Sequence, residues 1–467
     1  MSIKPPLRMT APPEVYRSRR ARLAATLRRP ILIPGGYAPA RNYPANTHPF
    51  RAGSTYLYLG GPPLEGAAWA IEAGSDGDAG CTLLRPAPGP DDALWLGETP
   101  ADAGLAAAAG VSAMHVMDVD GFGSRPSDRV PCWVGPPCVR SREWVNKLKL
   151  EPADQEELLA VIDLRLTKDE HELAAMRRAA QVNIAAHRAA LAATAPGRRE
   201  ADVAGAFVAV LVAQECRPSF TPIITVHGEV LHSDSYANPL RNGALLLVDA
   251  GAEEPGGYAC DITRTVPVSG AWTAVQRHLY ETVLRAQREA VAACVPGRRF
   301  RDIHDEAART LCAGLVQADL LRGDPAELAE RRAHTLFFPH GLGHLIGLDV
   351  HDMEDFGDLA GYGPGRTRRS TFGDNFLRLD RDLSPGMAVT IEPGIYLVPA
   401  IWRRDDLVSP FTDAVNRRAI DALLKAEFGG IRIEDTVCVR TSGGPENLTE
   451  ALPTDADGVA GLVGTGA

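Results

Sequence analysis

The feature that most constrains the fold of this chain is a pair of apolar, β-like runs that each contain an aspartate. ALLLVDAG (244–251) and YACDITRTVPV (258–268) flank the turn sequence EEPGG. Short apolar runs on either side of a Pro-Gly turn predict a β-hairpin. If the turn is centred on Pro255, Asp249 and Asp261 face each other, with Cβ atoms about 5 Å apart. Two carboxylates at that distance repel each other unless cations lie between them, so this arrangement predicts a cation site. The alternative is that the aspartates only cap turns.

Two glutamates lie in other apolar, β-like runs, Glu392 in VTIEPG and Glu434 in IRIEDTV. Glutamate is depleted in strands and is rarely buried without a partner. Taken alone, each could be a surface carboxylate on an edge strand. Strand periodicity places Arg432 on the same face as Glu434. The recurrence of buried-looking acids favours a shared site.

Three of the twelve histidines, His340, His344 and His351, fall within HGLGHLIGLDVHD. No glutamate follows the first histidine, so the zincin motif H-E-x-x-H is absent. Carboxylates with one or two imidazoles suit Mn²⁺, Co²⁺, Fe²⁺ or Zn²⁺. Four carboxylates balance two divalent ions, and paired ions polarise a carbonyl and activate water. The residues therefore predict a dinuclear hydrolytic centre.

Composition limits the classes of partner and compartment. The net charge of −10 argues against nucleic acid as a general partner. The sequence contains no apolar leader and no apolar run of about 20 residues, so we expect no membrane segment. The eight cysteines are scattered and form no C-x2-C pair. This pattern predicts free, buried thiols in a reducing cytoplasm.

The character of the sequence changes near residue 165, which predicts two domains. Short apolar runs punctuated by Gly, Pro and Asp indicate an α/β domain over 1–165. Its strand-like runs are 31–34, 55–60, 67–71, 81–84 and 93–97. Thr167 and Glu170 then form a capping-box pattern that begins a long helix. Further helical patterns, at 199–215, 272–294 and 301–318, alternate with mostly antiparallel β-like runs. They predict an α+β or mixed α/β domain over 166–467, without an internal repeat.

Five segments together resemble a known family. The segments are VDAG, CDITRT, HGLGHLIGLDVHD, TIEPGIY and GIRIED, which follow one another in this order over about residues 165 to 455. They resemble the motifs of the pita-bread (creatinase/aminopeptidase) metallopeptidases, in the aminopeptidase P and prolidase branch. YPANTHPFRAGSTYLYLGG resembles part of that branch's smaller N-terminal α/β domain. The resemblance implies an Xaa-Pro aminopeptidase that hydrolyses the N-terminal Xaa-Pro bond through a hydroxide bridging two divalent ions. Manganese is expected, with Zn²⁺ or Co²⁺ as alternatives.

Carried over residue by residue, the resemblance implies five metal ligands. Asp249 would bind one ion, and Asp261 and Glu434 would bridge both. His344 would be the only imidazole ligand. Glu392 would bind the other ion and accept a proton from the nucleophilic water. Three histidine ligands would leave no open position for that water, which fits a single imidazole ligand.

The resemblance also implies residues that contact the substrate. His340 and His351 would flank the metal site, polarise the scissile carbonyl and hold the proline side of the peptide. His232, in EVLHSDSY, matches a further histidine on the substrate side. Arg432 would anchor a neighbouring acidic group, and Tyr396 would line the site. Imidazoles beside the attacking water suit transition-state stabilisation.

The segment between His351 and Glu392 is longer than in the shorter aminopeptidases P. Residues 353–381 resemble the same region in prolidases and in a bacterial subgroup of aminopeptidase P homologues. Arg378 matches an arginine that holds the carboxylate of a dipeptide in prolidases, so Xaa-Pro dipeptidase activity is the alternative function. A second insert, 401–428, has no readable role.

A non-enzymatic binding module on the same fold is a more remote alternative. It is disfavoured because all five ligand positions are filled. The expected partners are proline-containing peptides and further copies of the chain, in a dimer or a tetramer.

Overall fold

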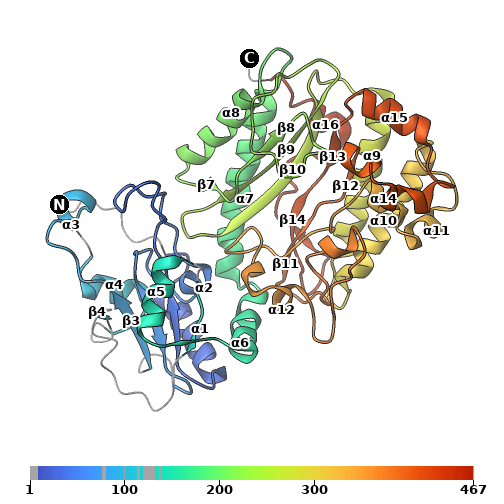
Figure 1. Ribbon diagram of the computed structural model, residues 1–467. Coiled ribbons are helices and arrows are strands. Elements are labelled where there is room, and N and C mark those ends of the chain that lie inside the picture. Colours follow the sequence, from blue (N-terminus) through green and yellow to red (C-terminus); the bar gives the residue numbers. More distant parts are fainter. Residues whose placement is uncertain are drawn as a thin grey trace. The chain divides into compact units, whose positions relative to one another are not determined.

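The computed structural model describes residues 9–75, 80–98, 100–112, 116–118, 132–135 and 138–465. The chain forms two compact units, Met1–Leu166 and Thr167–Ala467, and Figure 1 shows their helices and strands. The predicted site residues, 232–434, all belong to the second unit.

The N-terminal unit contains a mixed six-stranded sheet of order β4-β3-β2-β1-β5-β6. Its strands are β1 (Ile31–Pro34), β2 (Ala68–Ile71), β3 (Cys81–Arg85), β4 (Val116–Asp118), β5 (Cys132–Trp133) and β6 (Glu151–Pro152). Its helices are α1 (Pro13–Thr26), α2 (Ser54–Tyr58), α3 (Asp92–Leu96), α4 (Asp102–Ala109), α5 (Val139–Lys147) and α6 (Gln155–Leu166). Leu32, Leu84 and Val145 pack in the core.

Two of the strand-like runs in this unit are helices instead. The run at 55–60 forms α2, and the run at 93–97 forms α3. Apolar runs this short do not distinguish a strand from a buried helical turn by periodicity. Gly60 and Gly97 follow these helices with φ of 81° and 77°, and glycine in the left-handed region commonly ends a helix. The runs at 31–34, 67–71 and 81–84 are strands, as expected.

The C-terminal unit is built around the long β9–β10 hairpin (Figure 1). Its strands are β7 (Arg217–Pro218), β8 (Ile223–Thr225), β9 (Leu245–Glu253), β10 (Ala259–Pro267), β11 (Ala388–Ile391), β12 (Gly394–Tyr396), β13 (Gly430–Arg432), β14 (Asp435–Cys438) and β15 (Glu446–Asn447). All of their pairings are antiparallel. A single bridge joins Thr263 of the hairpin to Glu434, between β13 and β14, and another joins Leu345 to Val389 of β11.

Helices cover these strands (Figure 1). They are α7 (Glu170–Ala192), α8 (Glu200–Ala213), α9 (Ala274–Ala292), α10 (Phe300–Gln317), α11 (Pro325–Glu330), α12 (Asp358–Gly361), α13 (Pro399–Trp402), α14 (Asp405–Val408), α15 (Arg417–Lys425) and α16 (Ala456–Ala460). Short 3₁₀ turns are η3 (Ala333–Leu336), η4 (Glu354–Phe356), η5 (Asp374–Phe376) and η6 (Ser409–Phe411). Ala179 and Ala180 of α7 pack against Cys260 and Ile262 of the hairpin. None of the helices in the described ranges is long and apolar enough to cross a membrane.

The helix that opens the C-terminal unit has a different cap from the predicted one. Asp169, not Thr167, is the N-cap, and Glu172 completes the capping box. Aspartate accepts from the first free N–H groups at least as well as threonine. The sequence contains two overlapping patterns of this kind, and the backbone selects the later one.

The register of the hairpin also corrects the sequence prediction. Asp249 pairs with Thr263, and Asp261 pairs with Gly251. The two aspartates are therefore diagonal rather than opposed, because the turn is centred one residue later than Pro255. This change shifts the pairing by two residues and keeps both side chains on one face. A Cβ at position 251 would lie 2.0 Å from the Ser219 hydroxyl, so only glycine fits beside Asp261.

The expectation that this unit holds no internal repeat is wrong. The α7–α8 turn reads APGRR and the α9–α10 turn reads VPGRR. Gly197 and Gly297 have φ of 89° and 82°. They donate hydrogen bonds of 2.9 and 2.8 Å to the carbonyls of Leu240 and Leu383, respectively. The turns of the two helix pairs therefore bind equivalent segments, each of which directly precedes a strand.

The repeat continues into the strands. When LRNGALLLVDAG is aligned with LSPGMAVTIEPG, Asp249 matches Glu392, and each acid follows a glycine by six residues. CDITRTVPVSG and IEDTVCVRTSG match Asp261 with Glu434. Each copy of the pattern therefore supplies two of the four carboxylates.

Candidate active site

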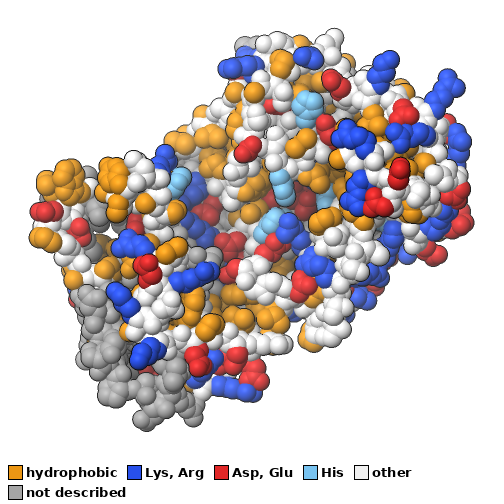
Figure 2. Space-filling model, in the orientation of Figure 1, with side chains coloured by type: hydrophobic (Ala, Val, Ile, Leu, Met, Phe, Trp, Pro, Cys, Tyr) orange, Lys and Arg blue, Asp and Glu red, His pale blue; other side chains and the backbone are white. Residues whose placement is uncertain are grey.

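A cavity of about 680 Å³ opens in the C-terminal unit. Figure 2 shows histidine and acidic side chains beside apolar ones on this unit. Every predicted site residue except Tyr396 lines the cavity, namely His232, Asp249, Asp261, His340, His344, His351, Arg378, Glu392, Arg432 and Glu434. The fold therefore brings together residues that are up to 202 positions apart, the difference between 434 and 232.

Asp261 and Glu434 lie at the buried end of the cavity. Asp261 is 4% exposed and Glu434 is 2% exposed. Burial, together with the negative charge of neighbouring carboxylates, raises the pKa of both groups well above their ordinary values. Oδ1 of Asp261 has no hydrogen-bond partner among the described residues. Carboxylates that repel one another in a buried site are stabilised by a cation.

His344 faces these carboxylates with one ring nitrogen. Its Nδ1 lies 3.0 Å from the carbonyl of Leu345, which places the ring hydrogen there and leaves Nε2 as an acceptor. Nε2 lies 4.0 Å from Oδ2 of Asp261 and 3.6 Å from Oε1 of Glu392. Burial lowers the pKa of His344 well below its ordinary value, so the ring is neutral. A neutral imidazole held by a backbone carbonyl is the usual form of a metal-binding histidine.

The donor atoms fit a divalent ion. Asp261, His344 and Glu434 each offer one ligand atom, and these atoms lie within 4.8 Å of one another. Two negatively charged oxygens and one neutral nitrogen suit ions such as Mn²⁺ or Zn²⁺. These three residues form the candidate metal site.

Glu392 lies directly after β11, between the candidate metal site and His340. Its backbone N–H donates to the carbonyl of Leu342 at 2.8 Å, which joins β11 to the HGLGH segment. A Cβ at Gly343 would lie 1.9 Å from the carbonyl oxygen of Thr390, so this approach requires glycine. Burial raises the pKa of Glu392 to about 7. A carboxylate with a pKa near neutrality is suited to exchange a proton.

Asp249, Arg432, Tyr396 and His340 form a continuous chain of contacts. Nη2 of Arg432 donates to Oδ2 of Asp249, and Nη1 donates to the Tyr396 hydroxyl at 2.8 Å. That hydroxyl lies 2.9 Å from Nε2 of His340. Nδ1 of His340 lies 2.8 Å from the carbonyl of Gly341. Nδ1 therefore carries the hydrogen, and Nε2 accepts from the tyrosine.

This chain corrects the expected position of Tyr396. The side chain is 0% exposed and lies behind His340 and Arg432 instead of lining the cavity. Burial lowers the pKa of His340 to about 3, so His340 is neutral beside the cavity. The sequence contains no signal for this contact, because Tyr396 and His340 are 56 residues apart.

Three further predicted residues, His232, His351 and Arg378, also line the cavity. The ring of His351 has its centroid 4.2 Å from that of His344. Burial and the positive charge of Arg378 lower the pKa of His232. Nη1 of Arg378 forms an ion pair with Oε2 of Glu354, and Nδ1 of His351 lies 3.3 Å from the same oxygen.

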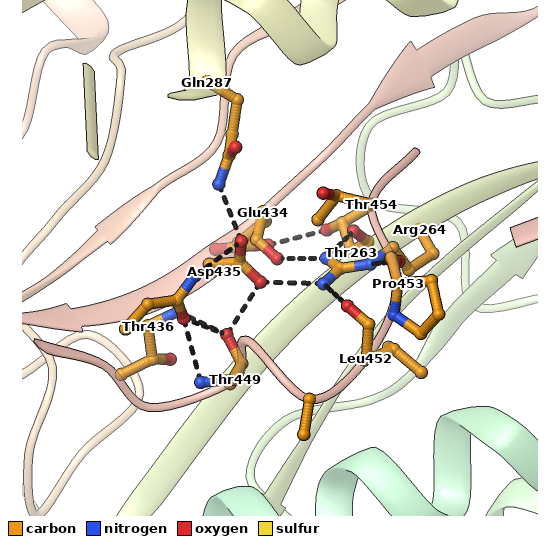
Figure 3. Close-up of polar contacts among 12 residues, drawn as sticks. Thr263, Arg264, Gln287, Glu434, Asp435, Thr436, Thr449, Leu452, Pro453 and Thr454 are labelled. Carbon is orange, nitrogen blue, oxygen red and sulfur yellow. Dashed lines mark hydrogen bonds and ion pairs between the residues drawn. The ribbon is translucent and has the colours of Figure 1, made fainter. Parts of the chain in front are cut away.

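A buried ion pair that the sequence prediction missed supports Glu434. Arg264 donates to the carboxylate of Asp435 and to four backbone carbonyls, those of Thr263, Glu434, Leu452 and Pro453 (Figure 3). These bonds use all five N–H groups of the guanidinium. Asp435 also accepts from Gln287 at 2.7 Å and from Thr449 at 2.7 Å. The available signal was the presence of Arg264 within DITRT and of Asp435 within RIED.

Comparison with known proteins identifies the family. Residues 174–441 match the model of metallopeptidase family M24, and residues 16–124 match the aminopeptidase P N-terminal domain. A probable Xaa-Pro aminopeptidase pepP of Neosartorya fischeri is 31% identical over 431 residues, which is 86% of each chain. This chain belongs to metallopeptidase family M24. Within that family it is a member of the aminopeptidase P group.

Solved structures show the same architecture. Proline aminopeptidase P II from Yersinia pestis is 27% identical with a TM-score of 0.78, and the match covers 97% of this chain and 99% of that one. Zn-substituted E. coli aminopeptidase P in complex with product is 26% identical with a TM-score of 0.79, over 97% and 98% of the chains. The same E. coli enzyme has been solved with the inhibitor Pro-Leu. The predicted combination of an α/β N-terminal domain and a pita-bread catalytic domain is confirmed.

Proposed function

We propose that this chain is an Xaa-Pro aminopeptidase, a metallo-exopeptidase that removes the N-terminal residue that precedes proline. The observation that carries the proposal is the cavity in which Asp261, His344 and Glu434 converge beside Glu392 and three further histidines. Family membership and the names of the relatives agree with this activity.

Five residues would hold two divalent ions: Asp249, Asp261, His344, Glu392 and Glu434. The proximity of three of their donor atoms supports the set, and so does the internal repeat, which supplies the four carboxylates in equivalent pairs. We propose Mn²⁺ as the physiological ion, with Zn²⁺ or Co²⁺ as alternatives. Divalent ions in this site would polarise the scissile carbonyl and lower the pKa of water.

The chain's own groups would move and place the reacting atoms. Glu392, with its pKa near 7, would accept the proton of the attacking water. Neutral His340 can donate only through Nδ1 and can accept only through Nε2, which Tyr396 occupies. It would therefore be held in one orientation beside the substrate. His351 and His232 would contact the carbonyl and the proline side of the peptide.

The apolar part of the cavity lining suits a proline ring. This part of the lining includes Phe220, Leu231, Val350, Phe372, Phe376 and Val398. Pyrrolidine carbons gain free energy when they leave water for such a surface. A related structure with Pro-Leu as inhibitor supports proline peptides as substrates.

Xaa-Pro dipeptidase activity is the second candidate function, because Arg378 lines the cavity. The test follows the products of Gly-Pro and Arg-Pro-Pro side by side, with and without Mn²⁺ and after chelation. Release of arginine from Arg-Pro-Pro that is lost with the chelator and restored by Mn²⁺ would support the aminopeptidase. Cleavage of Gly-Pro alone would establish the dipeptidase. If the metal-loaded protein cleaves neither peptide, both functions are wrong.

Compartment and assembly are further proposals. The eight cysteines, all within the described residues, form no disulfide, and seven of them are buried, which supports a reducing compartment such as the cytoplasm. A dimer or tetramer stays a prediction, which light scattering of the purified protein would test.

A further inference from the structure

Glu354 lies behind the active-site cavity and contacts two residues that line it. Its Oε2 accepts from Nη1 of Arg378 and lies 3.3 Å from Nδ1 of His351. Glu354 lines a separate cavity of about 60 Å³, which Arg378 also borders. Its other oxygen, Oε1, is buried without a partner among the described residues. Glu354 lies outside the five motifs that contain the proposed metal ligands.

The backbone before Glu354 is held in an unusual conformation. Met353 has φ of 62° and is fully buried. A non-glycine residue in the left-handed region persists only where its surroundings enforce it. The preceding residue, Asp352, forms a buried ion pair with Lys168 at 2.7 Å. The position of Glu354 is therefore determined by packing and not by a flexible loop.

Arg378 is held equally firmly on the other side of the pair. The hydroxyl of Tyr362 and Nη1 of Arg368 each donate to the carbonyl of Leu377 at 2.7 Å. These two hydrogen bonds within the segment 362–378 hold the backbone directly before Arg378 in place. Glu354 and Arg378 meet as parts of two anchored segments.

Arg378 is the cation that a charged substrate would meet. Arg378 and Arg432 are the two Arg or Lys residues in the described lining of the cavity. Arg432 is 4% exposed and its guanidinium is bonded to Asp249, Tyr396 and Thr263. The Arg378 side chain is 39% exposed. A free substrate carboxylate inside the cavity would therefore be drawn to Arg378.

Glu354 neutralises the positive charge of Arg378 before any substrate binds. Burial raises the pKa of Glu354, but the hydrogen bond from His351 and the positive charges of Arg378 and Arg368 outweigh this effect and lower the pKa below its ordinary value. Glu354 is therefore ionised at neutral pH. A substrate carboxylate at Arg378 would lie beside a second negative charge, and like charges in contact are unfavourable. A neutral amide carbonyl would accept from the same guanidinium without that repulsion.

We propose that Glu354 is a specificity-determining residue that disfavours substrates with a free carboxylate on the proline and favours peptides that continue past it. The proposal rests on the proposed Xaa-Pro aminopeptidase function and deepens it. The carboxyl carbon of an Xaa-Pro dipeptide is two bonds from the scissile nitrogen, so its charge cannot leave the cavity. In a longer peptide the same position is an amide.

The test compares Gly-Pro with Gly-Pro-amide, two substrates that differ only in their terminal group. The ratio of kcat/KM for the acid to kcat/KM for the amide is measured with Mn²⁺-loaded wild-type protein and with Glu354→Gln. We expect the ratio to rise about ten-fold in the variant. A loss caused by displacement of His351 affects both substrates and cancels in the ratio. A ratio that stays constant or falls overturns the proposal.

Two further variants separate the effect from general damage. Asp358→Asn removes another acidic partner from the neighbouring segment, where it pairs with Arg368, and should leave the ratio unchanged. In Arg378→Met, adding Glu354→Gln should no longer raise the ratio. If Glu354→Gln is inactive, calorimetric binding of L-proline and L-prolinamide to the metal-loaded variant replaces the kinetic ratio. Failure of wild-type protein to cleave either substrate contradicts the proposed function; an unchanged ratio with an active enzyme contradicts only the role of Glu354.

Discussion

The hydroxyl of Tyr396 lies 2.9 Å from Nε2 of His340 and also accepts a 2.8 Å hydrogen bond from Arg432. One buried phenol therefore connects the Asp249–Arg432 ion pair to a histidine at the cavity surface. The tyrosine hydroxyl donates to Nε2 of His340, so the imidazole carries its own hydrogen on Nδ1, and burial keeps the ring neutral.

Replacing Tyr396 by Phe should lower kcat about 10- to 100-fold while the metal content stays unchanged, because a group that orients an active-site residue has effects of this size. Steady-state kinetics and metal analysis of the variant check the expectation. Tyr280→Phe is the matched control, because its buried hydroxyl bonds to the carbonyl of Thr454 at 2.8 Å, outside the cavity lining. Equal losses in the two variants would contradict the role of Tyr396.

His344 and His351 should respond differently to replacement by alanine. His344→Ala removes a candidate ligand and should reduce metal content. His351→Ala should lower turnover by about 10²- to 10⁴-fold while the metal stays bound. Metal analysis after gel filtration, combined with kcat, distinguishes the two. Loss of metal from His351→Ala would show that the division of roles is wrong.

Metal uptake should release protons, so the protein should bind metal more weakly at low pH. Burial raises the pKa of Glu392 from 4.5 to about 7, and that of Asp261 and Glu434 is raised well above its ordinary value. Metal binds the ionised form, so the apparent Kd for Mn²⁺ should fall as pH rises through about 7. Calorimetric titrations in buffers of different ionisation enthalpy measure the released protons. Heats that do not depend on the buffer would contradict this expectation.

The same shifts predict how the metal-free protein responds to pH. An acid whose pKa is raised on folding destabilises the folded state once the pH exceeds its unfolded pKa, and the effect grows until the pH passes the folded pKa. For Glu392 this window runs from 4.5 to about 7. The increase in melting temperature caused by Mn²⁺ should therefore be larger above the window than within it. Thermal denaturation with and without Mn²⁺ across this range is the measurement.

The buried Arg264–Asp435 pair should be important for stability. Asp435→Asn leaves the guanidinium, which is 0% exposed, without its counter-ion. Removing one partner of a buried pair destabilises by about 3–5 kcal/mol, which chemical denaturation of the metal-free protein would measure. Asp457→Asn is the control, because its pair with Arg277 lies at the surface and should contribute nothing measurable. Similar denaturation midpoints for the two variants would contradict the prediction.

The sequence by itself determined which donors the site contains. Asp249, Asp261, Glu392 and Glu434 stand out because acidic residues in apolar strands are locally unfavourable, and this conflict can be read without knowing the fold. The repeat that relates them is also present in the sequence, in the paired PGRR turns and strand motifs. It escapes a search for close similarity because the two copies share few identical residues, and even the metal-site aspartates of one copy match glutamates in the other.

Only the tertiary structure decided how these groups are arranged. The diagonal placement of Asp249 and Asp261 depends on a turn whose centre the sequence does not specify to one residue. The positions of Tyr396 behind His340, and of Glu354 between His351 and Arg378, depend on how separate segments pack. Local patterns record which residues are buried, because burial follows strand and helix periodicity. They do not record which buried groups meet, because each contact is set by backbone segments that are distant in the chain and are held together by the whole core.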